Sequence, residues 1–136
     1  MNVPAALAAR VRQRANHRCE YCRMSQSLQG ASFHIEHIQP RVHGGKTFLA
    51  NLALACPGYN LHKADRISAK DPATENLVPL FHPRKNSWHE HFHWSGTRLE
   101  ALSAAGRSTV RLLQLNHPRR LLIRKAEGRF GLFPPD

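Results

Sequence analysis

The segment from residue 33 to 63 contains side chains that could together hydrolyse a phosphodiester bond. A carboxylate and an imidazole are adjacent at Glu36 and His37, amides follow at Asn51 and Asn60, and the segment ends in a further histidine and a lysine. Such hydrolysis requires an activated water, neutralisation of the phosphate charge and stabilisation of the leaving oxygen. One histidine and one hard cation can supply all three. An isolated Glu-His pair is more often an ordinary surface pair, so the hypothesis depends on the surrounding residues.

Three cysteines lie in this segment and just before it. Cys19 and Cys22 are separated by two residues. Cys56 opens a second Cys-x-x pattern that ends in Tyr59 instead of a fourth cysteine. An odd number of cysteines with this gap favours metal ligation in a reducing compartment over a disulfide framework. Three thiolates can hold Zn²⁺ with a water, His17 or, less favourably, the Tyr59 phenol as the fourth ligand. The alternative is that the metal has been lost and the cysteines are buried thiols.

The chain is strongly basic, with 20 Lys and Arg against nine Asp and Glu and a formal net charge of +11. This excess favours a polyanionic partner, and we expect nucleic acid. No apolar run approaches the roughly 18 residues of a membrane span, and no signal-peptide core is found. We therefore expect a cytoplasmic protein of a prokaryotic cell with no membrane partner. The sequence leaves the oligomeric state open.

A hairpin is expected to position the Glu-His pair. The pattern predicts β structure over residues 33–38 and again over 49–56, and Gly44 and Gly45 allow the tight reversal between them. Alternation along the first strand places neighbouring side chains on opposite faces. A bulge or the end of the strand is therefore expected to adjust either the glutamate or the histidine.

The other predicted elements are short and surround this hairpin. Pro4 suits the first turn of an opening helix whose arginines face solvent, and the chain from Glu127 onward is expected to be loosely held. Helices are predicted over residues 4–15, 59–68 and 108–115, an extended strap over 77–84, and a C-terminal hairpin with strands 91–94 and 98–102.

Taken together, these motifs resemble the HNH endonuclease family over roughly residues 8–83. The resemblance implies a ββα-metal fold in which His37 activates the water and Glu36 is the metal-binding carboxylate. Asn51 would brace the loop and the histidine ring, and Asn60 would supply an oxygen ligand to the metal. His62 ranks lower as a ligand, because residues two apart do not share a helical face.

The resemblance also implies two kinds of metal. A carboxylate, an amide and waters form a hard-oxygen set that favours Mg²⁺, with Mn²⁺ as a substitute, whereas ligation by His62 would admit softer ions. Family members usually close a zinc knuckle with two Cys-x-x-Cys pairs, so Tyr59 is a departure from their pattern. Zn²⁺ at Cys19, Cys22 and Cys56 is therefore left open.

Basic side chains are expected to contact the phosphate backbone, although a charged run can also be a plain solvated face. Lys63 is a candidate because it follows the metal-binding motif, and Arg41, Lys46 and Arg66 flank that motif. The same surface is expected to include Arg84, Lys85, Arg119, Arg120, Arg124 and Lys125.

A second histidine group lies outside the motif. His89, His91 and His93 are spaced by two and would share one face of a strand. They could form a second metal cluster, but we favour a polar face opposite two aromatic residues.

As a whole, the sequence predicts one small α+β domain over residues 1–136, built on a ββα-metal unit with flanking helices and a C-terminal hairpin. The core motif covers about residues 17–70, and a C-terminal extension covers about 77–126. The expected function is metal-dependent hydrolysis of DNA, leaving a 5′ phosphate and a 3′ hydroxyl. The alternatives are a non-catalytic nucleic-acid-binding module with a degenerate zinc knuckle, and a nuclease that prefers RNA.

Overall fold

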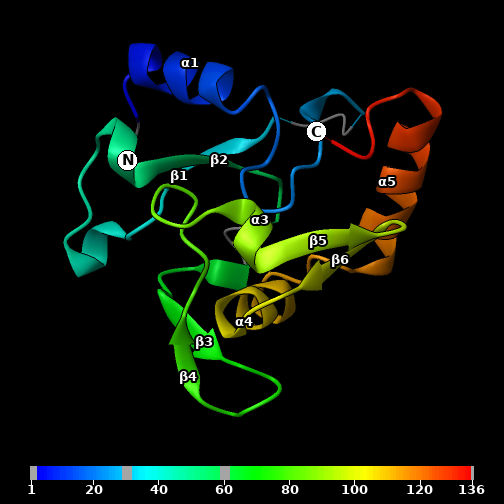
Figure 1. The fold of residues 1–136 in the computed structure, drawn as a ribbon. Helices are drawn as coiled ribbons and strands as arrows, with labels where there is room; N and C mark the ends of the chain where they lie inside the picture. Colours follow the sequence, from blue (N-terminus) through cyan, green and yellow to red (C-terminus); the bar gives the residue numbers. More distant parts are fainter. Residues whose placement is uncertain (1–2, 29–31, 59–61, 136) are drawn as a thin grey trace.

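A computed structural model describes residues 3–28, 32–58 and 62–135, and its described strands pair as three antiparallel hairpins (Figure 1). The helices are α1 (Ala5–Arg14), α3 (Trp88–His91), α4 (Ala104–Leu112) and α5 (Pro118–Arg129). The strands are β1 (His34–His37), β2 (Leu52–Ala55), β3 (Ser68–Lys70), β4 (Leu77–Pro79), β5 (Phe92–Ser95) and β6 (Arg98–Ala101). This mixture of helices and small antiparallel sheets confirms the predicted α+β class in its general form.

The β1–β2 hairpin is regular and lies beneath α1 (Figure 1). All four residues of β2 are buried, whereas Glu36 is the one buried residue of β1. Arg12 donates to the Phe33 carbonyl at 3.1 Å and Arg14 to the Leu52 carbonyl at 2.6 Å. Arg14 is exposed, as predicted for the solvent side, and Arg12 is half-buried, but the guanidinium groups of both also satisfy carbonyls beside the hairpin.

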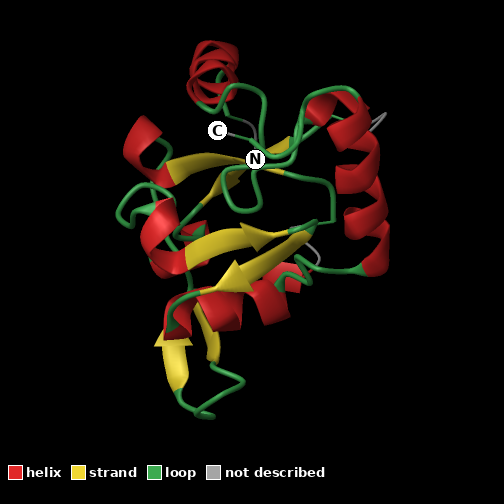
Figure 2. Cartoon of the chain, turned by 45° about the vertical axis from the view of Figure 1, so that its right-hand side comes forward, coloured by secondary structure: helices red, strands yellow, loops and turns green. Residues whose placement is uncertain are grey.

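The C-terminal half forms a second layer. The β5–β6 hairpin runs above α4, and α5 flanks it on one side, as Figures 1 and 2 show from two directions. The β3–β4 hairpin projects beyond α4, with Leu77 70% exposed. The predicted C-terminal hairpin is confirmed by the pairing of Phe92–Ser95 with Arg98–Ala101.

One core joins the two layers. It combines buried aliphatic side chains of β2 with the cysteines and with aromatic residues from both halves of the chain. The Trp88 indole donates to the Tyr21 carbonyl at 2.8 Å, so a residue of α3 is fixed directly to the cysteine segment. Residues far apart in the sequence thus share a dry interior, which favours cooperative folding.

Three local predictions fail. His89 and His91 lie in α3, so they do not share a strand face with His93. The helix predicted over 59–68 does not extend to Ser68, which begins β3; residues 62–63 are helical, and 59–61 lie outside the described residues. The chain at Glu127 is not loosely held, because this residue is fully buried in the last turns of α5.

The remaining elements agree better with the sequence. The first residues of the strap predicted over 77–84 are extended and pair with β3 as β4, whereas residues 83–84 lie in a turn. The helix predicted over 108–115 begins earlier, at Ala104, because the Ser103 side chain caps it by accepting from the Gly106 amide. Within the described part of the chain, no helix has the length and apolar character to cross a membrane.

Candidate active site and cysteine centre

His37 closes strand β1 opposite Leu52. Its ring is partly exposed, and its Nε2 atom lies 2.8 Å from the Thr47 hydroxyl oxygen. Partial burial, followed by the positive charge of Arg41, lowers the pKa of the imidazole from its usual value of 6.5. Thr47 thus orients an accessible imidazole, and the lowered pKa favours its neutral form, which a general base requires.

Asn51 braces the loop that carries Thr47. Its Oδ1 atom accepts from the Gln39 amide at 2.8 Å, and its Nδ2 atom donates to the Gln39 and Lys46 carbonyls at 3.1 and 2.9 Å. Both the donor and acceptor capacity of the side chain are thus used, as proposed for the middle asparagine. The His37 ring is held by the Thr47 hydroxyl and not by Asn51.

The two loop glycines serve different purposes. Gly44 has a φ of 85°, a left-handed conformation that glycine adopts without strain. Gly45 has no such angle, but a side chain there would overlap the Gln39 carbonyl and approach the Asn51 amide. Close backbone packing, and not only conformational freedom, therefore requires glycine at position 45.

Glu36 faces the interior, away from His37. It is only 6% exposed, accepts a hydrogen bond from the Tyr21 hydroxyl, and lies 3.9 Å from the Lys63 ammonium through its other oxygen. Burial raises the pKa of the carboxyl to about 7, while Lys63 and Tyr21 act in the opposite direction. In this structure both carboxylate oxygens are directed to protein partners.

The residues behind the second strand are only partly described. Lys63, predicted to contact phosphate, is 2% exposed and donates to the Ile38 carbonyl at 3.0 Å, so its ammonium lies in the interior. His62, the helical residue before Lys63, is half-buried. Asn60, the predicted oxygen ligand, lies outside the described residues, as does Tyr59.

Six of the predicted phosphate-contacting side chains are exposed, namely Arg41, Lys46, Arg66, Lys85, Arg119 and Lys125. Others, such as Lys63 and Arg124, are buried and have internal partners. Arg124 is fully buried and donates to the carbonyls of Thr97 and Leu115, since a buried guanidinium needs acceptors. The cationic surface is consequently smaller than the sequence suggested.

Cys19, Cys22 and Cys56 meet in the core, with their sulfur atoms all within 4.8 Å of one another. Among the described residues, they are the only group of three or more His, Cys, Asp or Glu side chains placed to hold a metal ion. Hydrogen bonds from Cys19 and Cys56, and then the charge of Arg120, lower the pKa of the Cys22 thiol well below its usual range. Burial raises the pKa of the Cys19 thiol. Three sulfur donors gathered in the core fit a soft ion such as Zn²⁺.

Arg120 of α5 approaches this cysteine centre from the C-terminal half. Its Nη1 atom lies 2.8 Å from the Cys56 sulfur and 3.9 Å from the Cys22 sulfur. His17, considered as a fourth ligand, is exposed and is not part of the group. The sequence suggested Arg120 only as a phosphate contact, because its pairing with Cys56 spans 64 residues.

The role of Thr47 was also missed from the sequence. It lies two residues after the glycine pair, beside His37. The Asn51 side chain holds this loop by donating to the Lys46 carbonyl. The glycine pair was the available signal, since a reversal there must bring the next residues back beside the first strand.

Comparison with known proteins gives one match. No curated protein and no solved structure matches the chain. A family model described as HNH endonuclease matches residues 19–66, which include all three cysteines, His37, Thr47 and Asn51. The match suggests nuclease activity on nucleic acid. It confirms that this segment, with its cysteine centre and its histidine, resembles the HNH endonuclease family.

Proposed function

We propose that this protein is an endonuclease that hydrolyses phosphodiester bonds of double-stranded DNA, with His37 as the general base. The observation that carries the proposal is the state of His37 within the segment that matches the HNH family. Its ring is accessible, held by Thr47 at 2.8 Å, and has a pKa shifted toward the neutral form. These are the properties needed to take a proton from an attacking water.

The proposed reaction uses one tautomer of His37. With Nε2–H donating to the Thr47 hydroxyl oxygen, Nδ1 carries the lone pair that accepts the proton of a water. The water oxygen then bonds to phosphorus as the bond from phosphorus to the 3′ oxygen breaks. Solvent protonates the leaving oxygen, and His37 returns its proton to solvent. The products are a 5′ phosphate and a 3′ hydroxyl.

The predicted magnesium ligands are not assembled by the described residues. Glu36 directs its carboxylate to Tyr21 and Lys63, and Asn60 lies outside the described part of the chain. The proposed steps therefore use His37. Plasmid cleavage in Mg²⁺, Mn²⁺ or EDTA measures the dependence on a divalent cation.

The cysteine centre fits a structural role. We propose that it holds Zn²⁺, which would cross-link residues 19–22 to the residue that follows β2 and so fix the segment behind the hairpin. Three thiolates around Zn²⁺ leave one negative charge. The guanidinium of Arg120 is placed to neutralise it.

One observation favours a second candidate, the non-catalytic nucleic-acid-binding module. Glu36, the predicted metal-binding carboxylate, and Lys63, the predicted phosphate contact, are buried and paired with each other. In a binding module these residues would act only as scaffold, and the exposed Arg41, Lys46 and Arg66 would contact phosphates.

Plasmid cleavage tests the proposal. Supercoiled plasmid is incubated with the protein in Mg²⁺, Mn²⁺ or EDTA, and nicked and linear products are separated on a gel. We expect His37→Ala to reduce cleavage by about 10²- to 10⁴-fold, the usual contribution of a general base. His93→Ala, at an exposed position of β5, is the matched control and should cut normally. A plasmid that is bound but intact under every metal would support the binding module instead.

A further inference from the structure

A cationic pocket adjoins the cysteine centre, and Cys19 is among the residues that line it. It has a volume of about 460 Å³ and is formed by the end of α1, the segment around Cys19 and the chain leading into α3. Its lining includes Arg14, Arg18, Arg23 and Arg84 but a single carboxylate, Glu20. The pocket thus has three more cationic than anionic side chains.

Two of these arginines are fixed by the protein. Arg18 donates to the carbonyls of Arg23 and Leu132 at 3.0 and 2.9 Å. Arg14 donates to the carbonyls of Leu49 and Leu52, the latter at 2.6 Å. Both contribute positive charge to the pocket while serving as part of its wall.

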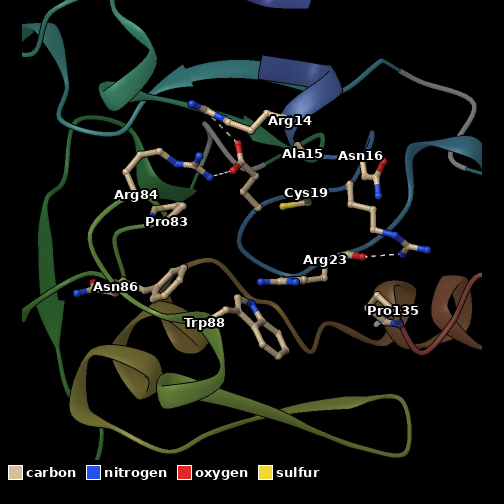
Figure 3. A pocket seen from close by; sticks show the side chains of 13 residues that line it. Arg14, Ala15, Asn16, Cys19, Arg23, Pro83, Arg84, Asn86, Trp88 and Pro135 are labelled. Atoms are coloured by element: carbon tan, nitrogen blue, oxygen red, sulfur yellow. Dashed lines mark hydrogen bonds and ion pairs between the residues drawn. The ribbon is translucent and has the colours of Figure 1, made fainter. Parts of the chain in front are cut away.

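The other two have unused donors. Arg84 pairs with Glu20, but its Nε atom is buried without a hydrogen-bond partner. The Arg23 guanidinium lies 4.8 Å above the centre of the Trp88 ring, and within the described residues no acceptor receives its N–H groups. Figure 3 shows Arg23 extending into the pocket over Trp88, with Arg14 and Arg84 on the facing wall.

The electrostatics of the pocket favour an incoming anion. Burial, and then the neighbouring Arg14, lowers the pKa of Arg84 to about 10. Cations crowded in this way are stabilised when an anion enters, because it supplies both the missing charge and the missing acceptors.

We propose that this pocket binds a phosphate group carried by the nucleic-acid strand. Planar guanidinium groups match phosphate oxygens with paired N–H donors, and such charge-assisted bonds are about twice as strong as neutral ones. The volume exceeds that of a lone phosphate, so room remains for an attached sugar. That the phosphate belongs to a nucleic-acid strand rests on the proposed function, whereas the binding of phosphate by the arginines does not.

The pocket is connected to the proposed active site through one residue. Arg14 donates to the carbonyl of Leu52, and Leu52 is the strand partner of His37. A strand phosphate held by Arg23 and Arg84 would therefore lie in a pocket whose wall residue Arg14 is hydrogen-bonded to the hairpin that carries the general base. This contact would position substrate without touching the reacting atoms.

Tryptophan fluorescence tests the inference. The chain contains two tryptophans, so Trp94→Phe leaves Trp88, beneath Arg23, as the reporter. The protein also carries His37→Ala and is assayed without added divalent cations, so that no strand is cut. It is titrated at constant ionic strength with inorganic phosphate and with a single-stranded oligonucleotide. We expect a saturable change with both probes and tighter binding of the oligonucleotide.

Arg23→Gln should weaken both titrations on the order of tenfold, the size of one lost charge-assisted contact. Arg98→Gln, at an exposed position of β6, is the matched control and should leave inorganic phosphate binding unchanged. Arg23→Lys should restore part of the affinity, and thermal melts confirm that each variant is folded. Loss in both glutamine variants, or no saturable change at all, would overturn the inference.

The two probes separate the possible sources of the phosphate. Saturation by inorganic phosphate without tighter binding of the oligonucleotide would overturn the strand as the source. The titration does not depend on cleavage. If the unsubstituted protein fails to cut plasmid while the reporter protein still shows the Arg23-dependent signal, the proposed function is disproved and the phosphate pocket is retained.

Discussion

The two ends of the β1–β2 hairpin hold their functional groups in opposite ways. At one end Cys56 follows β2 with 1% exposure, and its charge partner, Arg120, lies 64 residues away in the sequence. At the other end the His37 ring is accessible, and its partner, Thr47, is 10 residues away. One end is closed by long-range contacts, and the other is shaped by a local loop.

This difference separates stability from activity. A buried centre gains its energy from being dry and fully paired, so losing a distant partner should weaken the whole fold. An open site needs orientation more than burial, so losing a local partner should misplace one ring. The comparison can be tested by removing one contact at each end.

The largest effect on stability is expected at the closed end. Arg120→Met keeps the length of the side chain but removes the cation facing the sulfurs, which should lower the free energy of unfolding by about 3 kcal/mol. Urea denaturation measures the change. Arg119→Met, the exposed neighbour on α5, should stay within about 0.5 kcal/mol.

Metal analysis on the same samples sharpens this result. Protein purified without chelator should contain about one zinc per chain if the cysteine centre is a zinc site. A zinc content near zero would contradict the metal site. Equal destabilisation by both arginine variants would remove the special role of Arg120.

A smaller loss of stability is expected at the open end. Asn51→Ala removes three hydrogen bonds and leaves the backbone of Gln39 and Lys46 without its partners, at a cost of about 2 kcal/mol. Cleavage should fall further than stability alone explains, because Thr47 is no longer held beside His37. Plasmid cleavage at a temperature where the variant is folded separates the two effects.

The matched control for this loop is Asn76→Ala, at an exposed position before β4. It should leave both cleavage and unfolding unchanged. An Asn51→Ala variant that is destabilised but cuts at the normal rate would show that the loop does not position the histidine.

The smallest effect concerns the pH dependence of cleavage. Burial and Arg41 lower the pKa of His37, so the neutral base is lost only as the pH falls below its usual value of 6.5. Cleavage should therefore rise with pH through a midpoint below 6.5 and then level off. Arg41→Gln removes one cause of the shift and should move the midpoint upward, by less than about one pH unit.

Rates measured from pH 5 to 8 test this prediction, with Arg98→Gln as the charge-matched control. A midpoint that moves downward in Arg41→Gln, or moves equally in both variants, would contradict the assigned electrostatic cause.

The sequence predicted the open end better than the closed end. The Glu-His pair, the glycines and Asn51 lie within 16 residues of one another, so spacing and turn chemistry indicate how they meet. The family resemblance, confirmed over residues 19–66, rests on this local pattern. Alternation also indicated that Glu36 and His37 would face opposite sides, although it did not identify the interior partners of Glu36.

Long-range pairing could not be predicted in the same way. Lys63, Arg120 and Arg124 are chemically ordinary surface residues, and only the assembled fold supplies the acceptors that draw them inward. Glu127 was assigned to a loose tail because its charge suggests solvent, yet α5 carries it into the interior. For the same reason the cationic pocket around Arg23 has no sequence signature, since its walls come from three separate segments.

The contact of Arg120 with the cysteines also has a consequence for protein synthesis. Cys22 leaves the ribosome 98 residues before Arg120, so the thiols of the nascent chain are made long before their cation exists. Until then they are open to oxidation or to capture of a metal ion, and any ion acquired early would later be enclosed by α5. The order of translation thus gives metal loading a period in which it can precede closure of the fold.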